Sequence, residues 1–134
     1  MFISRFLAIF TVGVHLVSCE HFPTQAAAEW NKVISPFVNE CAPKEAKFKE
    51  EVDEIVKDAR VENDLITCGY LECLYEKLKF FGPNGEVRED VVMETLSYMT
   101  PEITKKCSDL ADAEIGICKK SYVLGNCAVH KLAV

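Results

Sequence analysis

Apolar residues recur along most of the chain with the three- and four-residue spacing of amphipathic helices, and no strand-like alternation of useful length occurs. The first apolar face begins after Thr24, a candidate N-cap, and comprises Trp30, Val33, Ile34, Phe37 and Cys41. Pro36 interrupts this face, so a kink or a break is expected there. The cleanest amphipathic segment follows, with one side formed by Phe48, Val52, Ile55, Val56 and Ala59.

Turn and capping residues divide the rest of the chain into four further helices. A third helix is expected over residues 64–81, and the turn sequence Gly82-Pro83-Asn84-Gly85 ends it. A fourth is expected over residues 87–99, with Val92, Leu96 and Met99 facing inward. Thr100 and Pro101 have the capping pattern of a fifth helix, and a sixth is expected over residues 113–128. The pattern predicts an all-α fold of about six short helices in one compact domain.

The N-terminal residues have the pattern of a secretory signal peptide, in which Arg5 precedes the apolar run 6–17. Cleavage is expected after Cys19, which divides the chain into a leader of residues 1–19 and a helical domain of residues 20–134. The apolar run is shorter than the roughly 20 residues of a membrane-spanning helix. A second interpretation stays open, because Leu16-Val17-Ser18-Cys19 also matches a bacterial lipobox in which Cys19 would be lipidated.

The domain that remains after cleavage is acidic. Without Arg5, its 14 basic and 21 acidic side chains give a net charge of −7. This charge disfavours binding to nucleic acid or to an anionic lipid surface, and it favours solubility. No segment of the domain approaches the length of a membrane span.

Removal of the leader leaves six cysteines, Cys41, Cys68, Cys73, Cys107, Cys118 and Cys127. An even number in a small exported domain indicates a disulfide framework, for which 15 pairings are possible. A zinc site is disfavoured, because no two cysteines have the two-residue spacing of a zinc knuckle and histidine is scarce. Two cysteines on one helix constrain little when joined to each other, so each is expected to reach a different helix.

From Trp30 to Val129 the chain resembles the insect odorant-binding proteins, whose six cysteines include a close second pair and a final gap of eight residues. The gaps here are 26, 4, 33, 10 and 8 residues. The resemblance implies helices around an apolar cavity and interlocked disulfides that join Cys41 to Cys73, Cys68 to Cys118, and Cys107 to Cys127. It also implies secreted binding and transport of small hydrophobic ligands such as odorants or pheromones.

The chain departs from the family pattern between its second and third cysteines, where four residues, Gly69-Tyr70-Leu71-Glu72, replace the usual three. Five helical positions turn Cys73 by about 140° from Cys68, against about 40° for four positions. Either the helix bulges at Gly69 or one disulfide approaches differently, and we expect a bulge because glycine inside a regular helix costs up to about 1 kcal/mol. The gap after Cys73 is also short for the family, which could trim the fourth helix or its loop.

Large apolar residues are numerous, and each could belong to an ordinary core or to the wall of a pocket. Because the resemblance implies a pocket, ligand contacts are expected from Phe37, Tyr70, Leu74, Leu78, Met93, Leu96, Met99, Tyr122 and Leu124. The hydroxyls of Tyr70 and Tyr122 are candidates for hydrogen bonds to a ligand oxygen. Met93 and Met99 are candidates for walls that adapt to ligand shape.

Catalysis has little support in the sequence, because outside the leader only His21 and His130 occur and each lies near a terminus. No cofactor is expected. The alternative to a carrier is a secreted interaction protein on the same scaffold, which would act on a protein partner through its acidic surface. Binding to a receptor and formation of a homodimer both stay open at this point.

Overall fold

The computed structural model describes residues 20–44 and 48–134, so the expected leader and the side chains of Phe48 and Val56 lie outside the described residues. This part of the chain forms seven helices: α1 Thr24–Ile34, α2 Val38–Cys41, α3 Phe48–Asp58, α4 Leu65–Lys77, α5 Glu89–Thr95, α6 Pro101–Asp112 and α7 Ile117–Leu132. Phe81 and Val87 add an isolated antiparallel bridge. The predicted all-α fold is confirmed.

The extra helix arises because the first expected helix is divided at Pro36. α1 ends at Ile34 and α2 begins at Val38, with a tight turn in which the backbone N–H of Phe37 donates to the carbonyl of Ile34 at 2.8 Å. Proline lacks a backbone N–H and its ring clashes with the preceding helical turn, so the helix cannot continue through it. The expected cap at Thr24 was wrong, since Pro23 occupies the N-cap position and Thr24 is the first helical residue.

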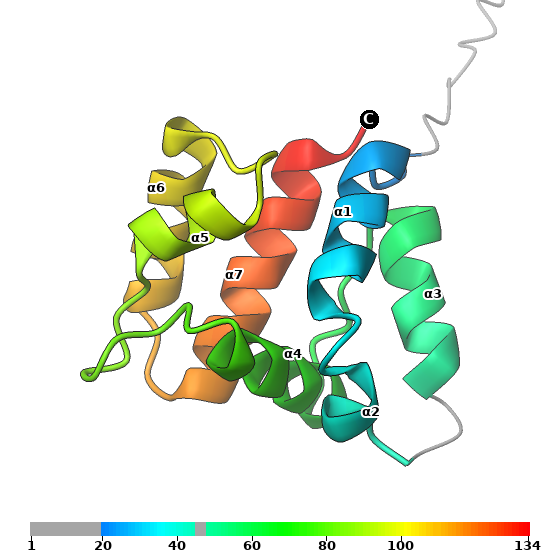
Figure 1. Ribbon diagram of the computed structural model, residues 1–134, viewed down its shortest axis with the longest axis horizontal. Coiled ribbons are helices and arrows are strands. Elements are labelled where there is room, and N and C mark those ends of the chain that lie inside the picture. Colours follow the sequence, from blue (N-terminus) through cyan, green and yellow to red (C-terminus); the bar gives the residue numbers. More distant parts are fainter. Residues whose placement is uncertain (1–19, 45–47) are drawn as a thin grey trace, which may run out of the picture.

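α7 is the centre of the helical packing (Figure 1). It packs along α4 and α6, while α5 packs on α6 and the short α2 packs on α4. α1 and α3 complete the domain on the side of α7 that faces away from α6 (Figure 1). Trp30 of α1 reaches both hydrophobic clusters of the core, the larger one around α7 and a smaller one between α2 and α4.

Three disulfides connect these helices. Cys41 of α2 is joined to Cys73 of α4, Cys68 of α4 to Cys118 of α7, and Cys107 of α6 to Cys127 of α7. The pairing is the interlocked one that the family resemblance implies. Each bond links two different helices, so together they fix α2, α4, α6 and α7 to one another.

Gly69 lies inside an uninterrupted α4, and the expected bulge is absent from this described helix. The five-position step from Cys68 to Cys73 needs no bulge, because it turns the two side chains by about 140° toward different partners. Cys68 reaches α7 and Cys73 reaches α2, on separate sides of α4. The extra residue between the two cysteines therefore changes the directions in which their disulfides leave α4, and the helix itself stays regular.

Gly69→Ala should stabilise the protein by up to about 1 kcal/mol. A Cβ at this position would meet no atom within 4 Å, and Gly69 is not among the described residues with a positive φ. Alanine would therefore add helix propensity without strain. Thermal or urea unfolding of the variant checks this expectation, and a loss of stability would show that α4 needs glycine for a local distortion.

The later helices follow the expected order with shifted ends. α5 covers only Glu89–Thr95, shorter than the predicted 87–99, because Val87 pairs with Phe81 and the chain leaves the helix at Leu96. Thr100 caps α6 as expected, with its side chain accepting the N–H of Ile103 at 3.2 Å and proline at the first helical position. α7 begins four residues later than predicted, after Gly116, whose φ of 89° suits glycine.

Candidate ligand-binding cavity

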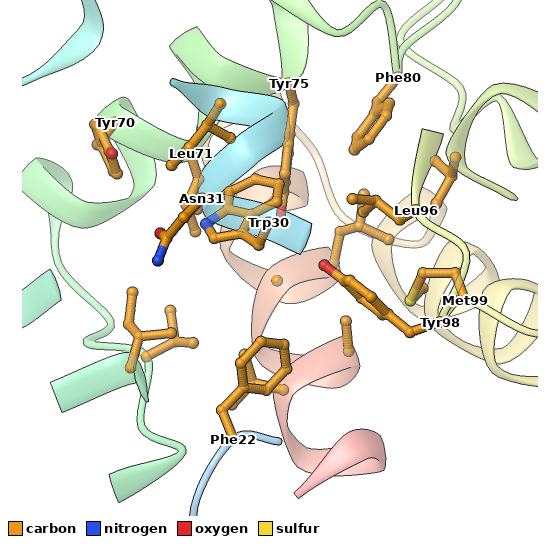
Figure 2. A pocket seen from close by; sticks show the side chains of 18 of the residues that line it. Phe22, Trp30, Asn31, Tyr70, Leu71, Tyr75, Phe80, Leu96, Tyr98 and Met99 are labelled. Atoms are coloured by element: carbon orange, nitrogen blue, oxygen red, sulfur yellow. The ribbon is translucent and has the colours of Figure 1, made fainter. Parts of the chain in front are cut away.

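An apolar cavity lies in the core of the domain, with walls from α1, α3, α4, α5 and α7 and from the segments that connect them. It is lined by Phe22, Trp30, Asn31, Ile34, Val52, Ile55, Val61, Tyr70, Leu71, Tyr75, Phe80, Val92, Leu96, Tyr98, Met99, Leu124, Gly125, Ala128 and Val129. Figure 2 shows the aromatic rings of this set arranged around the space. Of the described side chains that line the cavity, only that of Asn31 is exposed.

The cavity has a volume of about 80 Å³, taken as the space open to the centre of a water-sized sphere. One water needs about 10–15 Å³ by this measure, so there is room for about five to eight waters or for one small organic molecule. None of the described residues that line the cavity has a charged side chain. A cavity of this composition favours binding of an apolar molecule through surface burial.

Four of the residues that the sequence suggested for ligand contact lie in this lining: Tyr70, Leu96, Met99 and Leu124. They come from α4, from the segment that joins α5 to α6, and from α7. The fold therefore brings together residues that are more than 50 positions apart in the chain. All four are buried.

The other five suggested residues lie outside the lining. Leu74 is fully buried in the smaller cluster between α2 and α4, where Phe37 and Leu78 pack against it. Met93 lies half-buried on α5. Tyr122 lies half-buried on α7 with the Nζ of Lys119 5.2 Å from its ring centroid.

Four lining residues that precede or separate the helices were not predicted from the sequence: Phe22, Val61, Phe80 and Tyr98. Phe22 lies before α1, and Tyr98 lies in the connection between α5 and α6. Their rings meet edge to face with centroids 6.0 Å apart. Helical periodicity carries no information about such residues, although their size was a signal that could have marked them as candidates.

Two tyrosine hydroxyls supply polar groups to this apolar space. Tyr75 is buried and Tyr98 is half-buried, and burial raises the pKa of both phenols above its ordinary value. The neighbouring Tyr75 and Glu29 raise the pKa of Tyr98 further. Both hydroxyls therefore stay protonated at neutral pH and are available as hydrogen-bond donors. Burial likewise raises the pKa of Tyr70.

A carboxylate on α1 holds the segment that carries Tyr98. Glu29 accepts hydrogen bonds from the backbone N–H and from the hydroxyl of Ser97, each at 2.6 Å. Leu96, Tyr98 and Met99, the neighbours of Ser97, all line the cavity. The Glu29–Ser97 contact therefore joins two walls of the cavity, α1 and the α5–α6 connection, on the protein surface.

This contact should make a small, pH-dependent contribution to stability. The two hydrogen bonds from Ser97 lower the pKa of Glu29, so its contribution is present above the ordinary carboxyl range and is lost as the pH falls through the lowered value. Because the Glu29–Ser97 pair is exposed, we expect it to contribute less than about 1 kcal/mol to the free energy of unfolding. Melting curves of the protein and of Glu29→Gln should differ at pH 7 and converge in acid. Glu94→Gln, on the exposed surface of α5, is the matched control, and an equal effect of both variants would contradict this role for Glu29.

The described residues offer no competing site for a metal, since no group of three or more His, Cys, Asp or Glu side chains among them could hold an ion. Within the same part of the chain, no helix has both the length and the apolar character needed to cross a membrane.

Comparison with known protein families gives a match that covers most of the chain. The model of the PBP/GOBP family matches residues 24–131, which include α1 to α6, all of α7 except its last residue, and all six paired cysteines. Curated proteins and solved structures give no significant match.

Proposed function

Because the chain belongs to the PBP/GOBP family of insect odorant-binding proteins, we propose that it is a secreted carrier that binds small hydrophobic ligands and performs no catalysis. The family binds and transports odorants and pheromones. The observation that supports the same role here is the apolar cavity in the core, which is lined without any charged side chain among the described residues.

The physical argument starts from the cost of an unfilled cavity. Lining atoms that face empty space lose packing contacts, and a protein of this size has only about 5–15 kcal/mol of stability. A bound apolar ligand restores those contacts and stabilises the folded state by about 2.7 kcal/mol when its concentration is a hundredfold above its dissociation constant. The melting temperature should therefore rise as the fraction of protein with bound ligand increases.

Displacement of an apolar fluorescent probe tests this proposal. We expect the oxidised protein to bind the probe with micromolar affinity, about −8 kcal/mol, and to release it to medium-length alcohols or esters that also raise the melting temperature. Ala128→Phe should weaken binding at least about tenfold, because it places a ring where a methyl group lines the cavity. Ala113→Phe, on the exposed end of α6, is the matched control.

A protein that binds no ligand of the panel and shows no melting shift would contradict the carrier function. A saturable complex with a protein partner, in the absence of any small ligand, would then favour the alternative of an interaction protein. Both functions use the same disulfide-linked scaffold, so the ligand titration decides between them.

Secretion is supported by the expected leader of residues 1–19 and by the three disulfides, which persist in oxidising compartments. Mass analysis of the exported protein should find Glu20 as its first residue. A diacylated Cys19 at that end would instead establish the lipoprotein interpretation.

A further inference from the structure

We propose that the hydroxyls of Tyr75 and Tyr98 form the polar end of the cavity and select neutral ligands that carry an acceptor oxygen, such as aldehydes, ketones, esters and alcohols, over ionised fatty acids. The inference rests on the proposed carrier function and extends it by naming the chemical class of the ligand and two residues that determine specificity.

Tyr75 is held in one orientation by the rings around it. Its ring centroid lies 6.1 Å from that of Trp30, 5.3 Å from that of Phe80 and 6.2 Å from that of Phe81. The hydroxyl extends to Gly125 of α7, where the Cβ of any larger residue would lie only 3.0 Å from the phenol oxygen. The absence of a side chain at Gly125 therefore leaves room for this hydroxyl at the wall of the cavity.

Tyr98 approaches the cavity from another wall, the connection between α5 and α6. Its backbone is positioned by the neighbouring Ser97, which Glu29 binds twice, and its ring packs edge to face on Phe22. Figure 2 shows the Tyr98 hydroxyl pointing inward, toward Trp30 and Tyr75. The electrostatic influence of Tyr75 on the pKa of Tyr98 also indicates that the two phenols lie near each other.

Both hydroxyls belong to residues that line this apolar space, where a ligand oxygen can accept a hydrogen bond from them. A buried polar group without a partner is unfavourable, whereas a ligand oxygen that accepts from it recovers the bond in a low-dielectric setting. An alkane of the same length would fill the apolar cavity but would offer neither phenol an acceptor. The cavity should therefore prefer the oxygenated ligand.

An ionised carboxylate is disfavoured in the same place for two reasons. No lysine, arginine or histidine occurs among the described residues that line the cavity, so a buried carboxylate would lose its hydration without gaining a counter-charge. The charged group that acts on Tyr98 is the carboxylate of Glu29, which would repel an anion. Neutral oxygen acceptors avoid both costs.

Displacement titrations with octane, octanal, 1-octanol, methyl octanoate and octanoate at pH 7 test the inference. We expect the neutral oxygenated ligands to bind more tightly than octane and at least about tenfold more tightly than octanoate. Tyr75→Phe and Tyr98→Phe should each weaken binding of the oxygenated ligands about threefold to tenfold, which is the range of one neutral hydrogen bond, and leave octane unchanged. Phenylalanine keeps each ring contact, and Tyr122→Phe, outside the lining, is the matched control.

The possible failures are distinguishable. If octanoate binds as tightly as octanal, or if both phenylalanine variants bind every ligand as the parent does, the proposed selection is overturned while the carrier function stands. If the folded, oxidised parent binds none of the five ligands, the carrier function fails and this inference fails with it. Melting curves of each variant separate a lost hydrogen bond from a lost fold.

Discussion

Replacement of both Cys68 and Cys118 by alanine should lower the free energy of unfolding by about 4 kcal/mol. These residues are 50 positions apart, against 32 for Cys41 and Cys73 and 20 for Cys107 and Cys127. In the loop-entropy model a cross-link restricts the unfolded chain more when its loop is longer, so this bond should contribute the most. Three variants, each with one cysteine pair replaced by alanines, allow the comparison. Urea unfolding of these variants measures the order in which the disulfides contribute to the free energy of unfolding.

Each of the other two cross-links should contribute about 3–4 kcal/mol in the same model, so that full reduction removes an amount comparable with the whole stability of a small domain. We therefore expect reduced protein to lose saturable ligand binding as well as its cooperative melting transition. Retention of both after complete reduction, verified by thiol counting, would show that helix packing alone holds the cavity.

Leu74→Ala should destabilise the protein by about 3 kcal/mol while leaving ligand preference unchanged. The side chain is fully buried, and it packs in the smaller cluster between α2 and α4, outside the cavity lining. Its removal therefore creates a void in the core without altering the lining of the cavity. Equilibrium unfolding measures the first effect, and relative affinities for a ligand panel measure the second.

Leu65→Ala is the matched control, because Leu65 lies on the same helix with 84% of its surface exposed. It should change the free energy of unfolding by no more than about 0.5 kcal/mol. A changed order of ligand affinities in Leu74→Ala, with the fold intact, would place that residue in the site after all.

Helix positions were predictable wherever a local signal marked them. Pro36 indicated the break between α1 and α2, and Thr100 with Pro101 indicated the start of α6. The end of α5 was not predictable, because Leu96 and Met99 continue a helical spacing in a segment that is not helical. There the packing of the connection against α1, including the bonds from Ser97 to Glu29, outweighs periodicity.

It was harder to predict which buried apolar residues line the cavity and which pack elsewhere in the core. Tyr70 and Leu74 lie one turn apart on α4, yet the first lines the cavity and the second does not. α4 is buried on several sides, against α2, α3 and α7, so apolar character alone cannot tell which neighbour a residue meets. Gly69 illustrates a related limit, since the sequence did not show that α4 could stay regular with an extra residue between Cys68 and Cys73.

The two ends of the described domain are joined by a pair of backbone hydrogen bonds. The N–H of His21 donates to the carbonyl of Val134 at 3.1 Å, and the N–H of Val134 donates to the carbonyl of His21 at 3.0 Å. The next residue, Phe22, is part of the cavity wall. An environment-sensitive fluorophore attached at Val134 would therefore sit close to that wall, so the protein could report the presence of a volatile compound as a change in emission.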